Sequence, residues 1–115
     1  MTMVTDAEPR PDLRAASALF RSLGDPARLA ILRQLAGGEA RVVDLTAVLG
    51  LAQSTVSKHL ACLRDCGLVS IRAAGRASVY SLAQPALLEV FTAAEAVLAA
   101  TGNAVALCPG YAQAR

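Results

Sequence analysis

The sequence has no tryptophan, only 3% aromatic residues, a single lysine and three cysteines among its 115 residues. An odd cysteine count does not fit a disulfide framework, and charged residues at positions 6, 8 and 10 exclude the apolar run of a secretion signal. We therefore expect free thiols in a reducing cytoplasm. Glu89 and Glu95 interrupt the apolar stretch 86–100, so no membrane span is expected.

Alanine and leucine dominate what is present, with 25 and 17 copies, and hydrophobic residues make up 55% of the chain. Both residues enter helices at little cost, so the composition predicts a mostly helical protein with a packed core. A chain of this length forms one domain, and one near the size at which dimerisation adds useful burial.

Charge is unevenly distributed along the chain, although the net charge is only +2. Residues 41–80 carry five cationic and two acidic side chains, whereas residues 1–40 are balanced and residues 81–115 net −1. A positive middle third is typical of a surface that binds nucleic-acid phosphates.

The apolar spacing predicts five helices and one hairpin. Asp25-Pro26 is an N-cap followed by proline at the first helical position, and glycines follow the first four helices. Alternation on both sides of Gly75 predicts two antiparallel strands. The expected helices cover residues 12–23, 26–36, 42–49, 53–66 and 85–101, and the strands 68–72 and 77–82. The domain is expected to span residues 12–101, between an N-terminal tail (1–11) and a C-terminal tail (102–115).

This element order predicts a winged helix–turn–helix, in which the helix over 53–66 enters the DNA major groove. Val56, Leu60 and Leu63 form its inward stripe. Short polar side chains and cations lie on the other side of this helix and on the hairpin, where they suit contacts to phosphates and base edges. The candidate DNA-binding residues are Gln53, Ser54, Thr55, Ser57, Lys58, Arg72 and Arg76. The alternative is a winged-helix module for protein contacts, with these side chains merely solvated.

Three segments in order, 23–32, 53–60 and 63–69, resemble the ArsR/SmtB family of bacterial metal-responsive repressors, and Gly75-Arg76 resembles that family's wing. The resemblance covers about residues 13–98. It implies a homodimer whose first and last helices form the interface, bound to operator DNA until an inducer binds. Ala52 stands where the family often has a Ser or Thr cap, so that cap comes from Ser54 or is not made.

Two sensor sites known in that family cannot form in this chain. The arsenite-type cysteine pair would lie on the third helix, where residues 41–45 contain no cysteine. The zinc-type site needs histidine on the last helix, which offers only Glu89 and Glu95. The single histidine is His59, on the fourth helix.

Cys62 and Cys66 are four positions apart on that helix, which places their Cβ atoms about 5–6 Å apart on one face. Two thiolates so placed can bind one metal ion, and Cys108 in the C-terminal tail can supply a third. Structural zinc is nearly always four-coordinate, so three sulfurs suit Cd(II), Pb(II) or Hg(II) better. The pattern resembles the CmtR-type cadmium and lead sensors of the family, which implies Cys62, Cys66 and Cys108 as metal ligands and Cd or Pb as inducer.

Several alternatives stay open at this point. Hg(II), As(III) or Zn(II) can replace Cd or Pb as inducer, and Cys108 can come from the same protomer or its partner. His59 is either a fourth ligand or, more commonly for such a residue, a structural histidine. The cysteine pair can also be a redox switch, although thiols on adjacent helical turns are poorly aimed for a disulfide. The sequence has no Cys–His–acid or Ser–His–acid arrangement and no phosphate-binding loop, so neither an enzyme nor a small organic substrate is expected.

Overall fold

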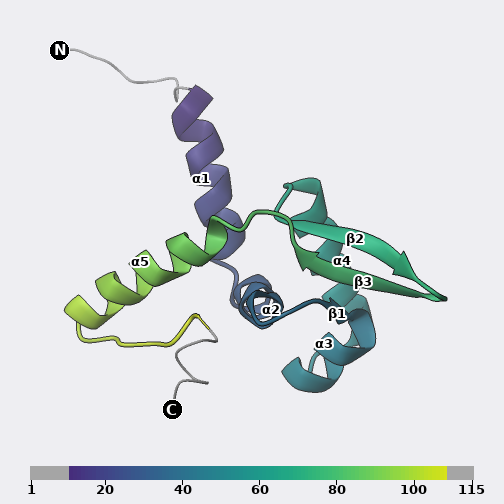
Figure 1. The fold of residues 1–115 in the computed structure, drawn as a ribbon. Coiled ribbons are helices and arrows are strands. Elements are labelled where there is room, and N and C mark those ends of the chain that lie inside the picture. The colour runs from purple at the N-terminus through teal and green to yellow at the C-terminus, as the bar shows by residue number, and fades with distance from the viewer. Residues whose placement is uncertain (1–10, 109–115) are drawn as a thin grey trace.

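The computed structural model describes residues 11–108, so the predicted N-terminal tail and residues 109–115 lie outside the described part, except for Pro11. This part of the chain forms five helices and three strands, which are labelled in Figure 1. In order they are α1 (Pro11–Leu23), α2 (Pro26–Ala36), β1 (Ala40–Arg41), α3 (Val42–Leu49), α4 (Gln53–Asp65), β2 (Val69–Ala74), β3 (Ala77–Leu82) and α5 (Leu87–Ala100).

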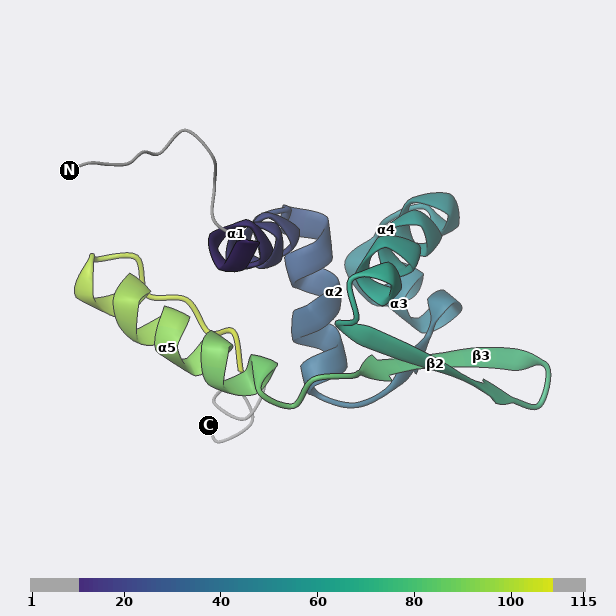
Figure 2. The ribbon, with the colours of Figure 1, turned by 90° about the horizontal axis from the view of Figure 1, so that it is seen from above.

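The core lies where α2, α3 and α4 meet the base of the β2–β3 hairpin, and α5 adds to it. The hairpin extends from these helices as a wing, as Figures 1 and 2 show. The predicted fold, mostly helical with a hairpin wing on a helix–turn–helix, is confirmed. Its largest fully buried side chains are Ile31, Leu32, Leu45, Val56, Leu60, Leu63 and Phe91.

The predicted cap of α2 is present. One carboxylate oxygen of Asp25 accepts hydrogen bonds from the backbone N–H groups of Arg28 (3.1 Å) and Ala27 (2.9 Å), and Pro26 occupies the first helical position. These bonds stabilise the ionised carboxylate and lower the pKa of Asp25. The start of α4 is different, because no side chain at its N-cap, Ala52, accepts such a bond.

The sheet has three strands, whereas the sequence predicts two. β1 pairs antiparallel with β3, with Ala40 opposite Tyr80, so the strand order is β1-β3-β2. A two-residue strand is too short to show alternation in the sequence. The turn of the wing is also tighter than predicted, because β2 continues to Ala74 and Gly75, at φ 63°, follows directly. At the other end of the chain, residues 85–86 form a turn and α5 begins at Leu87, two positions later than predicted.

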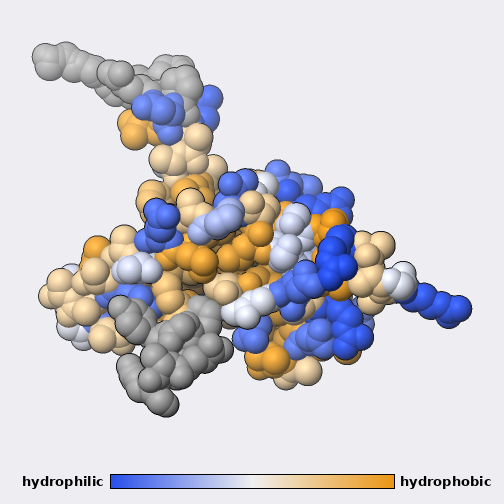
Figure 3. Space-filling view, viewed as in Figure 1, coloured by the Kyte–Doolittle hydropathy of each residue, from blue (hydrophilic) through white to orange (hydrophobic). Residues whose placement is uncertain are grey.

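The helices α1 and α5 lie at the end of the molecule away from the wing (Figures 1 and 2). Both helices keep large apolar side chains on their surface. Phe20 on α1 is 63% exposed and Val97 on α5 is 62% exposed; Leu13 and Leu88 are exposed as well. In Figure 3 apolar residues gather near the junction of α1 and α5, whereas hydrophilic residues cover much of the α3 and α4 end. No helix in residues 11–108 is long and apolar enough to cross a membrane.

Candidate DNA and metal interface

The polar face of α4 points to solvent. Val56, Leu60 and Leu63 are fully buried and fix the rotation of the helix. This rotation leaves the predicted contact residues accessible: Gln53, Ser54, Ser57 and Lys58 are exposed, and Thr55 is half-buried. The first turn of α4 has no side-chain cap, so its backbone N–H groups stay available to an anion. A helix start of this kind suits a DNA phosphate.

The two wing arginines have different surroundings. Arg72 is held by Glu39, to which its Nε donates a hydrogen bond of 3.3 Å and its Nη2 a second, shorter one. This ion pair lowers the pKa of Glu39 and raises that of Arg72. Arg76 sits at the turn of the wing and forms no hydrogen bond or ion pair within residues 11–108.

Ion pairing therefore lowers the number of cations in residues 41–80 that are free of an acidic partner and could contact DNA phosphates. Arg41 is also paired, with Asp44 at 3.1 Å. Among the described residues, three cations of this region form no ion pair: Lys58, Arg64 and Arg76. Sequence reasoning did not identify Glu39, because it lies 33 positions from Arg72 and only the fold brings the two together.

His59 is half-buried and faces α2. Its Nε2 lies 4.0 Å from the Asp25 carboxylate that caps α2, so the contact links α4 to the start of that helix. This position suits the structural role that the sequence favours for His59.

The cysteine pair lies at the end of α4, and both side chains are exposed. The backbone N–H of Cys66 donates to the carbonyl of Cys62 (3.1 Å), which places the two residues one helical turn apart. The helix ends at Asp65, one residue earlier than predicted, with Cys66 as its C-cap and Gly67, at φ 78°, directly after it. The thiol of Cys66 also lies 3.6 Å from the hydroxyl of Ser22 on α1. The pair is accessible to a metal ion, and thiolates are the donors that soft cations prefer.

Cys108 lies in the segment that follows α5 and packs against that helix. Its Sγ is 3.3 Å from the hydroxyl of Thr92 on α5, and its backbone N–H donates to Glu95 at 2.7 Å. Within residues 11–108, no three side chains of His, Cys, Asp or Glu are grouped so that they could hold a metal ion. One chain therefore does not bring Cys62, Cys66 and Cys108 together.

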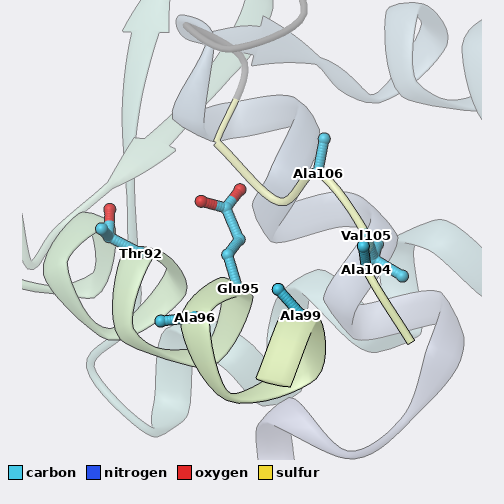
Figure 4. A pocket seen from close by; sticks show the side chains of 7 residues that line it. All are labelled: Thr92, Glu95, Ala96, Ala99, Ala104, Val105 and Ala106. Carbon is cyan, nitrogen blue, oxygen red and sulfur yellow. The ribbon is translucent and has the colours of Figure 1, made fainter. Parts of the chain in front are cut away.

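An open pocket of about 460 Å³ lies between α5 and the segment that follows it (Figure 4). Glu95 is its one ionisable lining residue and is 8% exposed. One of its carboxylate oxygens, Oε1, has no hydrogen-bond partner among residues 11–108. The sequence marks Glu95 only as a charge within an apolar stretch and does not predict this environment. The pocket is lined by Thr92, Glu95, Ala96, Ala99, Ala104, Val105 and Ala106.

Several known proteins are similar to this chain in sequence. Residues 25–70, from the α2 cap to the start of β2, match the family described as bacterial regulatory protein, arsR family. The chain is 35% identical over 108 residues to a probable mercury resistance operon repressor of Streptomyces lividans, covering 91% of this chain and 85% of that protein. It is 48% identical over 69 residues to the regulator CmtR of Mycobacterium tuberculosis, covering 60% of this chain and 58% of CmtR.

Solved structures share the fold. The crystal structure of Rv0081 from Mycobacterium tuberculosis superposes with a TM-score of 0.76 at 34% identity, over 81% of this chain and 94% of that one. The homodimeric winged helix–turn–helix domain of Mb0332 from Mycobacterium bovis gives 0.69 at 27% identity, over 83% and 89%. Rv0081 is described as an HTH-type transcriptional regulator and Mb0332 as a possible ArsR-family transcriptional regulator, which agrees with the prediction that the chain is not an enzyme. The chain belongs to the ArsR family of bacterial transcriptional regulators.

Proposed function

We propose that this protein represses transcription as a homodimer on operator DNA and is released when Cys62, Cys66 and Cys108 bind a thiophilic divalent ion, Cd(II) or Pb(II). The observation that carries the proposal is the exposed cysteine pair on the helix that reads DNA. A mercury resistance repressor and CmtR among the relatives support a metal-responsive role.

In the DNA complex, α4 lies in the major groove and the wing lies beside the adjacent backbone. Gln53, Ser54, Thr55 and Ser57 contact base edges or phosphates from the first turns of α4. Lys58 and Arg76 neutralise phosphates directly, since neither has an ion-pair partner in the described part of the chain. Arg72 can contact a phosphate only if its ion pair with Glu39 is broken.

The dimer forms through α1 and α5. These helices carry the exposed apolar residues Phe20, Leu13, Leu88 and Val97, which a partner would cover. A small domain gains stability from such burial, and the Mb0332 domain of similar fold is homodimeric. Two copies of α4 then read two half-sites of one operator.

The donor set fits a thiophilic ion, because two accessible thiols lie one turn apart at the C-terminal end of α4. The third thiol lies against α5, within reach of Thr92, and is not grouped with this pair in the described part of the chain. Cys66 contacts α1 through Ser22, and Cys108 contacts α5. Because α1 and α5 also carry the dimer surface, we propose that Cys108 of one protomer completes the site of its partner.

Release follows from charge and geometry. Three thiolates around a divalent ion carry a net charge of −1 close to the DNA-binding helix, where it repels phosphate. Linking α4 of one protomer to α5 of the other also restricts how far apart the two recognition helices can lie. A coupling free energy of about 1–3 kcal/mol suffices to weaken operator binding about 5–150-fold.

The test is a titration of reduced protein with Cd(II), Pb(II), Hg(II), Zn(II) and As(III). Thiolate-to-metal charge-transfer absorbance and operator affinity are followed together, in the wild type and in Cys62→Ser, Cys66→Ser and Cys108→Ser. Each cysteine variant should lose metal affinity and metal-induced release; Ala47→Ser, an exposed change on α3, should not. If Cd(II) and Pb(II) leave operator affinity unchanged in the wild type, the proposal is wrong.

A mixed dimer decides which protomer supplies Cys108. One chain carries Cys62→Ser and Cys66→Ser, and the other carries Cys108→Ser. This heterodimer has one complete three-thiolate site only if the third thiolate crosses between protomers. Peroxide treatment in the presence of a chelator addresses the redox alternative: a loss of operator binding without metal would favour it over metal sensing.

A further inference from the structure

We propose that Glu95 is a positioning residue for Cys108: its buried carboxylate fastens the C-terminal segment to α5 and thereby fixes where the third thiol is presented. The part of this inference that concerns metal binding rests on the proposed function. The part that concerns the segment itself does not, and it can be tested without metal.

The fastening consists of two hydrogen bonds to one carboxylate oxygen. Oε2 of Glu95 accepts from the backbone N–H of Leu107 (2.5 Å) and from that of Cys108 (2.7 Å). Bonds from N–H groups to an ionised carboxylate are short and about twice as strong as bonds between neutral groups. Both donors belong to the C-terminal segment and not to α5, so these hydrogen bonds of Glu95 hold the segment against the helix.

Neighbouring contacts hold the same segment. The guanidinium of Arg33 on α2 donates to the carbonyl of Ala106 (3.2 Å), and the side chain of Leu107 is 6% exposed within the core. The thiol of Cys108 then lies against Thr92 and the carbonyl of Leu88. Each of residues 106–108 therefore has its own contact with the rest of the fold, and these contacts fix the direction of the Cys108 thiol.

Burying the Glu95 carboxylate is energetically unfavourable, and the packing of α5 alone does not explain why a carboxylate lies there. A carboxylate removed from water is destabilising unless its hydrogen bonds are restored, and Oε1 of Glu95 has no partner in the described part of the chain. An apolar residue would serve better at this position if its only task were to pack. In Figure 4 the carboxylate points from α5 toward the segment that it holds. The arrangement is that of a residue that orients a ligand-bearing backbone.

Anchoring affects metal affinity because a thiol held in place loses less conformational entropy on binding. Losing a residue that orients a ligand typically weakens metal binding about 10–100-fold. We therefore expect Glu95→Ala to weaken Cd(II) binding by a factor in that range. If Cys108 instead had to leave α5 to reach the pair, the same substitution would tighten Cd(II) binding, which would overturn the inference.

The first experiment needs no metal. The alkylation rate of each cysteine in the apo dimer is measured by iodoacetamide pulses and peptide mass spectrometry. Glu95→Ala should raise the rate at Cys108 about tenfold and leave Cys62 and Cys66 unchanged. Glu95→Gln keeps an acceptor without the charge, so its effect should have the same sign and be smaller. Glu89→Ala, an exposed acidic residue of the same helix, is the control and should behave as wild type.

The second experiment is a double-mutant cycle with Cd(II) alone as the probe, in the wild type, Glu95→Ala, Cys108→Ser and the double variant. If Glu95 acts through Cys108, the double variant should bind Cd(II) no more weakly than Cys108→Ser. An equal loss from Glu95→Ala in both backgrounds, or an unchanged Cys108 alkylation rate in Glu95→Ala and Glu95→Gln, would refute the positioning role. A Cys108→Ser variant with wild-type Cd(II) affinity would instead refute the three-thiolate site of the proposed function.

Discussion

Lys58 provides a quantitative test of the DNA interface. Its ammonium group is exposed on α4 and has no ion-pair partner within residues 11–108, so each protomer can neutralise one phosphate with it. Each neutralised phosphate contributes about −0.9 to the slope of log affinity against log salt concentration. A dimer contributes two copies, so Lys58→Ala should make the slope less steep by about 1.8.

This change in slope converts into an affinity ratio. Between 50 and 200 mM salt, the deficit of Lys58→Ala relative to wild type should shrink by about 12-fold, because a fourfold rise in salt acts through about two contacts. Fluorescence anisotropy with labelled operator DNA across that range measures both slopes. The loss should also be similar for operator and unrelated DNA, since a phosphate contact carries no sequence information.

Two variants separate a phosphate contact from a general loss of charge. Lys58→Arg keeps the cation and should retain the wild-type slope, whereas Arg21→Ala removes the same charge from α1, outside the DNA-reading elements. A Lys58→Ala slope equal to that of wild type would refute the direct contact between Lys58 and a phosphate.

Three further predictions concern the wing, the α2 cap and the dimer. Glu39→Gln should release Arg72, steepen the salt slope by up to about 1.8 and tighten operator binding at low salt; an unchanged slope would show that Arg72 does not reach phosphate. Because the pKa of Asp25 is lowered in the folded state, its ionised cap stabilises the protein above its ordinary pKa and this stabilisation is lost as pH falls through the folded value. Asp25→Asn caps without titrating, so urea unfolding between about pH 5 and pH 3 should show a smaller acid-induced loss of stability than in wild type. Phe20→Glu or Val97→Glu should place charge in the dimer surface and give a monomer by sedimentation equilibrium, with weaker operator binding; a dimer of unchanged stability would exclude α1 and α5 as the interface.

The sequence by itself determined the features that depend on neighbours along the chain. The cap at Asp25-Pro26 and the buried stripe of α4 follow from local spacing, and the structure has both. The position of Cys62 and Cys66 one turn apart is likewise set by the helix repeat. Such features need no knowledge of the rest of the fold, because the interacting groups are at most four residues apart.

Only the tertiary structure decided which cations are ion-paired and where the third thiol lies. Arg72 reads in the sequence as a cation available to phosphate, but Glu39 reaches it from the segment before β1. Glu95 reads as an interruption in an apolar stretch, but in the fold it accepts hydrogen bonds from residues twelve and thirteen positions later. Helical and strand periodicity describes positions a few residues apart, so it carries no information about pairs that the chain brings together over longer separations.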